Sequence, residues 1–551
     1  MDLAPGGLEL YEGPSTINLA LGYIKVSLGA PTAPRGEKAL PGVPNGDRPA
    51  RSYLRRTHAQ DHVASPLKAP TNSRLGRTLD QQCDVVSVAI AMACVINIRP
   101  LQQRLALTAT HLGRRAYSST PASTASLPLR GVRVVDLSRI LAGPYGGMML
   151  ADYGAEVIKV ERPGVGDDAR AWGPPFTEKG HESAYFLAPN RNKRSIGVNL
   201  KSPEGQQIIR DLVKVSDILL ENYVPGTLER YGLDYESLRE LNPALVYGSL
   251  TGYGDTGPLK DKPGYAVMIE GRGGMMACTG IGDQPVKVGV AWTDILTGLH
   301  LHGGVLAALY KAKVTGEGRH VKCSLLESQV SALANVASGY LISGAECARR
   351  GTQHPNIVPY GAFPTADGHI VVGALNDAQW NSFCNVMGRP DLEMDEKFKT
   401  NEARCANREE LNGILNDILK TKPTDEWMAL LDALPHKQRL ANDKLNNMEG
   451  VRSALPHCHA DGCPHQVFSD PQVLARGMRM TVEHTTAGPI EVVGPAVKFD
   501  PAPPETERSL PPPALGEHTE WVLRNCLGYS PEKINTLAKD RVIHIMKKDS
   551  S

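Results

Sequence analysis

The chain has 551 residues, a formal net charge of +1, 41% hydrophobic residues and 22% charged residues. This is the composition of a globular protein with roughly three or four domain-sized units. A balanced charge gives no overall attraction to nucleic acid or to an anionic membrane, and no apolar run reaches the roughly 20 residues that a membrane helix needs. We therefore expect neither a nucleic-acid partner nor a membrane partner.

The N-terminal part divides into two segments of different character. Residues 1–91 are rich in Gly, Pro, Ser and Arg, which predicts a disordered extension. Residues 92–126 contain Arg99, Arg104, Arg114 and Arg115 but no Asp or Glu, which is typical of a mitochondrial transit peptide and predicts the mitochondrial matrix as location. The alternative is a basic disordered linker, because transit peptides normally begin near residue 1. The scattered placement of ten cysteines also favours a reducing compartment.

From residue 127 onward, predicted strands alternate with predicted helices. The β-branched runs at 131–138, 156–162, 194–200, 217–222 and 244–250 predict strands, and 143–155 and 201–216 predict helices. Ser202 is placed to cap the second helix, with Pro203 in its first turn. This alternation predicts an open, parallel, Rossmann-like α/β sheet in a large domain over 127–335. Ligands of such sheets bind outside the carboxyl ends of the strands. That places Arg162, Lys201, Asn222 and Tyr253 near the expected site.

The C-terminal half predicts a second, smaller domain. A linker over 336–360 leads to an α+β domain over 361–445, in which strands joined through "ADG" form a hairpin followed by helices. Strand-rich residues 467–545 would return to the large domain. Between them, 446–466 is an atypical insertion that holds His457, Cys458, His459, Cys463 and His465. Because their spacing fits no familiar zinc finger, we expect no metal there.

The stretch "VGVAWTDILTGLH" places Asp294 between a Gly/Val-rich run and an apolar segment of helical character. Thr293 or Asp294 would be an ordinary helix cap at this point. A carboxylate at the start of a helix is also stabilised as an anion, which suits a nucleophile. Local sequence leaves both roles open.

Several long motifs resemble family III CoA-transferases, in the order and spacing of that family, from about Leu127 to the region of Ile543. They read "LAGPYGGMMLADYGAEVIKVERPGVGDDAR", "NRNKRSIGVNLKSPEG", "ENYVPGTLERYGLDYESLRELNPALVYGSLTGYG", "VGVAWTDILTGLHLHGGVLAALYKAKVTGEGRHVKCSLLES" and "LGEHT". The resemblance implies an enzyme that moves CoA between carboxylic acids, in the branch that uses succinyl-CoA and dicarboxylates such as hydroxymethylglutarate or glutarate. It also implies an interlocked homodimer, with CoA thioesters as substrates and no permanently bound cofactor.

The resemblance further implies a role for particular residues. Asp294 would attack the donor thioester and then carry CoA as an aspartyl thioester. By position in the family motifs, the residues around CoA would be Arg139, Ile140, Leu141, Ala142, Arg162, Lys201, Asn222, Tyr223, Arg230, Lys262 and Tyr265. Gly273 and Gly274, with Gly271, are candidates for oxyanion donors. The alternative for Arg162 and Lys201 is a solvated charge at a strand end, and for Asn222 and Tyr223 a role in a turn.

Two features limit what the resemblance implies. The family usually carries an acidic residue where this chain has Ala266, so a carboxylate beside the anhydride would be missing or replaced by Glu270. A dicarboxylate acceptor also needs a clamp for its far carboxylate. Arg349, Arg350, His354 and Tyr360 are candidates, or else charges of a linker.

Three other function classes compete with CoA transfer. A Rossmann-type dehydrogenase is disfavoured because no G-x-G-x-x-G follows the first predicted strand. An acyl-CoA racemase of the same superfamily would need a His/Asp pair, and the region after the Gly-rich turn offers no clear histidine. An inactive CoA-binding protein is the third alternative, because of Ala266 and the insertion.

Overall fold

The computed structural model describes residues 126–435, 440–444, 466–502 and 509–547. The chain divides into two units, Met1–Arg115 and Ala116–Ser551, and every described residue belongs to the second. The predicted extension and almost all of the predicted transit peptide lie outside the described residues. So does the insertion apart from Gln466.

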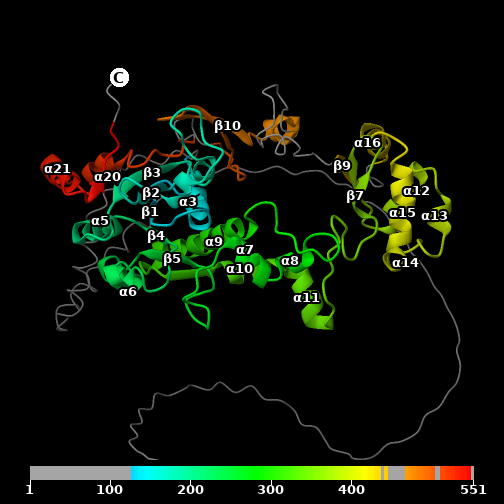
Figure 1. The fold of residues 1–551 in the computed structure, drawn as a ribbon, viewed down its shortest axis with the longest axis horizontal. Helices are drawn as coiled ribbons and strands as arrows, with labels where there is room; N and C mark the ends of the chain where they lie inside the picture. Colours follow the sequence, from blue (N-terminus) through cyan, green and yellow to red (C-terminus); the bar gives the residue numbers. More distant parts are fainter. Residues whose placement is uncertain (1–125, 436–439, 445–465, 503–508, 548–551) are drawn as a thin grey trace, which may run out of the picture. The chain divides into compact units, whose positions relative to one another are not determined.

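A seven-stranded sheet forms the centre of the large domain (Figure 1). Its strand order is β12-β3-β2-β1-β4-β5-β6. All neighbouring strands are parallel except β12, which runs antiparallel to β3. The strands are β1 (Arg133–Asp136), β2 (Glu156–Glu161), β3 (Lys193–Val198), β4 (Ile218–Glu221), β5 (Val246–Thr251), β6 (His320–Ser324) and β12 (Ile543–His544). The predicted α/β class with an open parallel sheet is confirmed.

Helices cover both faces of this sheet, and each face has its own apolar core. On one face α5 (Pro203–Lys214), α6 (Tyr235–Leu241), α20 (Thr519–Asn525) and α21 (Pro531–Lys539) bury Ile, Leu and Val side chains against the strands. On the other face the cover is made by α3 (Ala142–Asp152), α9 (Trp292–Thr315) and α10 (Leu325–Ala332). Figure 1 shows the strands between these two groups of helices. The apolar pairs Val134–Val135 of β1 and Val157–Ile158 of β2, and the run 218–220 of β4, follow from this burial on both sides.

The remaining elements of this part of the chain are short. They are η1 (Asp168–Ala171), α4 (Ala184–Leu187), η2 (Glu229–Tyr231), α7 (Ala266–Arg272), α8 (Met275–Cys278) and α11 (Ala334–Ser343). Local sequence explains several helix starts. The Ser202 hydroxyl accepts a hydrogen bond from the Gly205 amide, with Pro203 as the first residue of α5, as predicted.

Helices α3 and α9 approach closely because two glycines meet where they pack. A Cβ on Gly146 would lie 2.9 Å from the Gly298 carbonyl oxygen, and a Cβ on Gly298 would lie 2.5 Å from the Ala142 carbonyl oxygen. Real Cβ atoms essentially never approach backbone atoms below 3.0 Å. The two glycines therefore set the distance between the N-terminal halves of these helices.

A second apolar core forms around a small antiparallel sheet. Strands β7 (Tyr360–Pro364), β8 (His369–Gly373) and β9 (Ala441–Lys444) pair in that order, with β7 and β8 as the predicted hairpin. The helices that pack here, yellow in Figure 1, are α12 (Asp377–Val386), α13 (Asp391–Met394), α14 (Asn401–Ala406), α15 (Arg408–Leu419) and α16 (Thr424–Asp432). Trp380, Phe383 and Trp427 are fully or almost fully buried in this core.

The C-terminal segment contributes to the large sheet. Helices α18 (Gln466–Ser469) and α19 (Pro471–Ala475) precede a hairpin of β10 (Arg479–His484) and β11 (Gly488–Val493). Farther on, the His518 amide donates to the Ser195 carbonyl of β3, and Ile543 pairs with Val198. The sheet of the large domain is therefore completed by residues near the end of the chain.

Candidate active site

Asp294 lies in the first turn of α9, and neither Asp294 nor Thr293 caps that helix. The residue at the cap position is Ala291, which makes no side-chain capping bond. Thr293 is buried and its hydroxyl donates to the Gln329 side-chain oxygen of α10 at 2.6 Å. The capping hypothesis is therefore wrong, and the Asp294 carboxyl has no such structural task. Its place near the amino end of α9 favours negative charge.

A cavity of about 180 Å³ joins Asp294 to most of the residues that the sequence predicts around CoA. Among its lining residues are Arg139, Ile140, Leu141, Ala142, Asn222, Tyr223, Lys262, Tyr265 and Asp294. They come from loops after β1, β4 and β5 and from the start of α9, which is the carboxyl edge of the parallel sheet. Ligand pockets commonly measure about 300–1,000 Å³, so this cavity would admit only one end of a molecule as large as CoA.

The cavity also contains a lysine that the sequence reasoning missed. Lys260 lines the cavity together with Lys262. Both are exposed in the loop "GPLKDKPGY", where Gly and Pro surround the two cations. The signal available in the sequence was this pairing of lysines two residues apart in a turn-rich loop.

The turn after β1 is held rigidly by side chains from other loops. The Asn222 side chain accepts from the Arg139 amide at 2.9 Å and donates to the Arg139 carbonyl at 2.8 Å. The Asp167 carboxylate accepts from the Ile140 amide at 3.0 Å, and Ile140 has a left-handed backbone with φ of 72°. Such a conformation in a β-branched residue persists only where its surroundings fix it. Both polar groups of the Asn222 side chain bind the backbone of Arg139, so Asn222 positions the turn after β1.

Two predicted guanidinium groups converge beside Tyr223. Arg139 donates to Asp168 at 2.9 Å, and Arg162 pairs with the other oxygen of the same carboxylate. The Arg139 guanidinium also lies over the Tyr223 ring, 5.1 Å from its centroid. Two cations thus share one carboxylate, which leaves one positive charge of this cluster uncompensated by Asp168. Guanidinium groups in such a setting suit a phosphate.

Burial and a neighbouring carboxylate make Asp294 an unusually basic aspartate. The pKa of Asp294 is raised to about 6, first by burial and second by the neighbouring Glu270, while Lys287 acts in the opposite direction. Glu270 is fully buried on α7, while Ala266, where the family usually has an acid, is the first residue of that helix. The carboxylate expected near Asp294 is therefore present in this chain, one helical turn farther along.

Comparisons with known proteins agree with this geometry. The family model for CoA-transferase family III matches residues 129–519. This chain belongs to CoA-transferase family III. It is 42% identical over 455 residues to the succinyl-CoA:glutarate CoA-transferase of Homo sapiens, covering 82% of this chain and 98% of that protein. It is 43% identical over 403 residues to the succinate–glutarate CoA-transferase of Agrobacterium fabrum, covering 72% and 95%.

A solved structure supports the fold of this family III chain. The crystal structure of a CAIB/BAIF family protein from Brucella suis matches with a TM-score of 0.61 and 38% identity. The match covers 72% of this chain and 98% of that chain. The enzyme class predicted from the sequence is confirmed as a CoA-transferase by the family match and by the names of these relatives.

Seven other predicted residues of this family III chain lie outside the cavity lining: Arg162, Lys201, Arg230, Tyr253, Gly271, Gly273 and Gly274. Arg162 reaches the cation cluster described above, whereas Lys201 and Arg230 are exposed beside β3 and in η2. Gly273 and Gly274 follow α7, and the Gly273 amide already donates to the Ile269 carbonyl at 2.6 Å. That amide is therefore engaged, which argues against Gly273 as an oxyanion donor. Gly274 has φ of 85°, which favours glycine for conformational reasons.

The four candidates for a dicarboxylate clamp also lie outside the cavity lining. The Arg349 guanidinium donates to the carbonyls of Met276 and Asp283, at 2.9 and 3.2 Å, and so holds the turn that follows α8. The His354 and Tyr360 rings pack together at 5.1 Å, and Arg350 is exposed.

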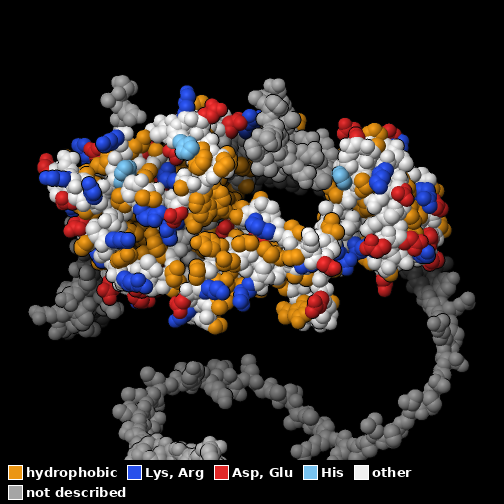
Figure 2. Space-filling view, in the orientation of Figure 1, with side chains coloured by type: hydrophobic (Ala, Val, Ile, Leu, Met, Phe, Trp, Pro, Cys, Tyr) orange, Lys and Arg blue, Asp and Glu red, His pale blue; other side chains and the backbone are white. Residues whose placement is uncertain are grey.

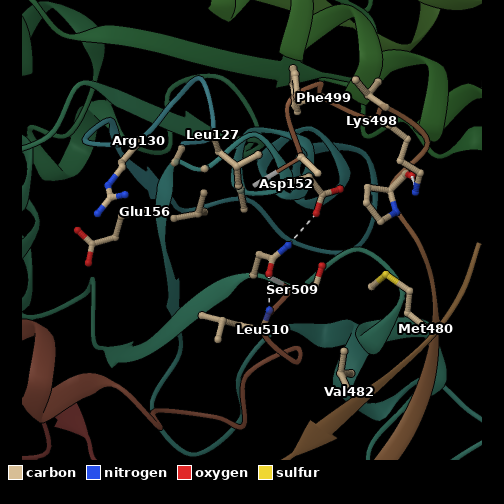
Figure 3. A pocket seen from close by; sticks show the side chains of 18 of the residues that line it. Leu127, Arg130, Asp152, Glu156, Met480, Val482, Lys498, Phe499, Ser509 and Leu510 are labelled. Atoms are coloured by element: carbon tan, nitrogen blue, oxygen red, sulfur yellow. Dashed lines mark hydrogen bonds between the residues drawn. The ribbon is translucent and has the colours of Figure 1, made fainter. Parts of the chain in front are cut away.

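A larger cavity of about 990 Å³ lies elsewhere, where residues of the ranges 477–502 and 509–510 meet α3, β2 and β3 (Figure 3). Its polar contacts serve the fold. Asn192 donates to Asp152 at 2.8 Å and accepts from the Leu510 amide, and Arg191 pairs with Asp152. Because Asp294 and the predicted CoA residues are absent from its lining, we place the chemistry at the smaller cavity.

Within the part of the chain that the structure describes, no three His, Cys, Asp or Glu side chains gather as metal ligands. Among the same residues, no helix combines the length and the apolar character that crossing a membrane requires.

Proposed function

We propose that this chain transfers CoA from succinyl-CoA to a dicarboxylate such as glutarate or hydroxymethylglutarate, through covalent intermediates on Asp294. The observation that carries the proposal is that Asp294 and most of the predicted CoA residues line one cavity at the carboxyl edge of the sheet. The names of the human and Agrobacterium relatives support the choice of donor and acceptor.

The proposed reaction needs no external energy source because a thioester is kept throughout. An Asp294 oxygen attacks the thioester carbon, the C–S bond breaks, and a mixed anhydride and CoA thiolate form. The thiolate then attacks the aspartyl carbonyl and releases the donor acid as a carboxylate. The acceptor carboxylate repeats both steps in reverse and leaves with CoA, which regenerates Asp294. Covalent catalysis thus divides one difficult displacement into easier steps.

Different residues of the site would bind different parts of CoA. The Arg139–Arg162 cluster suits the phosphates, because guanidinium groups form paired hydrogen bonds with phosphate oxygens. Lys260, Lys262 and Tyr265 line the same cavity as Asp294 and would lie along the arm that carries the sulfur. Holding the thioester carbon next to the carboxylate lowers the entropic part of the barrier.

Substitution of Asp294 tests the proposal directly. Asp294→Ala and Asp294→Asn are each expected to lower transfer from succinyl-CoA to glutarate by at least about 1,000-fold, because the nucleophile is lost. Asp283→Ala is the matched control, since Asp283 is an exposed aspartate outside the cavity lining. Transfer is followed by separating the two CoA thioesters chromatographically.

Mass analysis of quenched enzyme adds an independent readout. The wild-type peptide that contains Asp294 should gain the mass of CoA less one water after incubation with succinyl-CoA, and hydroxylamine should remove the CoA. Turnover by Asp294→Ala at the wild-type rate would contradict the proposal. Epimerisation without transfer would favour the racemase alternative, and binding without either reaction would favour an inactive CoA-binding protein.

We further propose that the chain acts as a homodimer in the mitochondrial matrix. Large apolar side chains are exposed on α7, α9 and α11, and Figure 2 shows hydrophobic side chains gathered over this stretch. Helix α11 buries none of its residues, with Leu341 80% and Ile342 86% exposed. Exposed apolar patches of this kind mark interfaces, and a second copy of the chain is the occupant we propose. The acid-free composition of residues 92–126 supports import, which N-terminal sequencing of the processed protein would test.

A further inference from the structure

Glu270 is a buried carboxyl that the proposed mechanism leaves without a task. It lies on α7 with none of its side chain exposed, and one oxygen, Oε2, accepts from the Val288 amide at 3.1 Å. The other oxygen, Oε1, has no hydrogen-bond partner within the described residues. A buried carboxyl with an unused oxygen is costly to keep. Such a cost points to a function rather than to stability.

The bond to Val288 ties Glu270 to the segment that leads into Asp294. Residues 285–290 connect the turn after α8 to the start of α9. Glu270 holds the Val288 amide of this segment, while the Lys287 ammonium donates to the carbonyls of Val288 and Val290 at 2.6 and 3.2 Å. A buried anion and an exposed cation therefore hold the same few residues upstream of the nucleophile.

Both groups also act on Asp294 through their charge, in opposite directions. Burial is the main cause of the raised pKa of Asp294, Glu270 raises that pKa further, and Lys287 lowers it. Burial raises the pKa of Tyr185 in α4, and the nearby Asp294 raises it further. Glu270, Lys287 and Tyr185 are thus the titratable groups that interact electrostatically with Asp294 among the described residues.

We propose that Glu270 is a positioning residue for Asp294, which fixes the 285–290 segment that leads into the nucleophile and makes the Asp294 carboxylate more nucleophilic. This inference rests on the proposed function of Asp294. The negative charge of Glu270 disfavours ionisation of Asp294 in this poorly hydrated site. The Asp294 carboxylate that does form is therefore a stronger base and a better nucleophile. Lys287 opposes this effect and keeps the ionised form accessible near neutral pH.

The pH dependence of catalysis tests the proposal. Asp294 must be ionised to attack, so the wild-type rate should fall as the pH drops through about 6. Glu270→Gln removes the like charge while an amide oxygen can still accept from Val288. The acid limb of kcat/KM for succinyl-CoA should then move down by about one pH unit. The plateau rate should fall by less than about tenfold, because a less basic carboxylate is a weaker nucleophile.

Lys287→Met is the companion variant with the opposite expected sign. Removing the cation should move the acid limb to higher pH, since Lys287 lowers the pKa of Asp294. Lys420→Met, an exposed lysine on the small α+β core, should leave the profile unchanged. A purely structural role for Glu270 would change the rate and thermal stability of Glu270→Gln without moving the limb. An unshifted limb, or an upward shift, would overturn the inference.

Adduct formation separates this inference from the proposed function. If wild-type enzyme carries CoA on Asp294 but the limb of Glu270→Gln coincides with that of wild type, only the role of Glu270 is wrong. If no adduct forms on Asp294 in wild-type enzyme, the proposed function fails first. Quenched mass analysis of both proteins at one pH on the plateau decides between these outcomes.

Discussion

At the scale of one residue, the ionised Asp294 carboxylate that the proposed reaction needs lowers the stability of the folded state. Its folded pKa lies near 6, above the ordinary value of 3.8, mainly because of burial. Compared with the unfolded chain, the folded state therefore favours the protonated form of Asp294. The stabilising contribution of this group is fully present below about pH 4 and is lost as the pH rises through about 6.

Asp294→Asn should accordingly stabilise the protein at neutral pH while abolishing transfer. A gain of about 1 kcal/mol is expected at pH 7.5, and the gain should vanish near pH 4 because the native carboxyl is then protonated as well. Thermal unfolding of both proteins at the two pH values measures this difference. A lower melting temperature for Asp294→Asn at pH 7.5 would contradict it.

The assignment of individual residues was only partly predictable from sequence. The motif around Asp294 identified the nucleophile candidate, but the cap position at Ala291 depends on where α9 begins. Asn222 was placed in the correct loop, yet its two bonds to Arg139 join residues 83 positions apart. Local sequence patterns do not encode contacts between residues so far apart in the chain. The role of Asn222 in holding the turn could therefore not be predicted from them.

At the scale of elements, the geometry of the site depends on how α3 meets α9. The turn that would contact the nucleotide precedes α3, and the nucleophile lies in the first turn of α9. The contact between Gly146 and Gly298 fixes how far apart these two helix starts lie. Catalysis is sensitive to shifts of about 1 Å between reacting groups, whereas stability tolerates small separations of helices better.

Gly298→Ala should therefore damage activity more than stability. The added methyl group would lie 2.5 Å from the Ala142 carbonyl oxygen, so the helices must move apart. We expect a loss of kcat/KM of about 100-fold and a destabilisation of about 1–3 kcal/mol. Gly303→Ala is the control, because Gly303 is on the same helix and has open space where a Cβ would lie. Equal effects of the two substitutions would contradict this role.

Elements whose signals are local were predicted well, and elements that depend on distant partners were not. Strands β1 to β5 and helix α5 follow from apolar runs and from the Ser202 cap. Strand β12 has only two residues and is a strand solely because it pairs with β3. No pattern two residues long could have revealed it.

At the scale of the whole molecule, the exposed apolar surface around α11 predicts the behaviour of the protein in solution. Ile342→Glu places a charge on a side chain that is 86% exposed, so the isolated chain should fold as before. The charge would be buried at the proposed interface, which should weaken self-association at least about tenfold. Light scattering coupled to size-exclusion chromatography measures the mass, and Glu346→Gln, at an exposed glutamate beyond α11, is the control. A monomeric wild-type protein would refute the dimer.

The pairing of β12 with β3 has a consequence for the order in which the molecule can be built. Six strands of the large sheet are encoded between Arg133 and Ser324, but the strand that closes its outer edge comes at Ile543–His544. During synthesis that edge of β3 stays open until Ile543 and His544 have left the ribosome. Exposed strand edges invite wrong pairing, so a nascent or truncated chain should depend on chaperones for longer than the finished enzyme does.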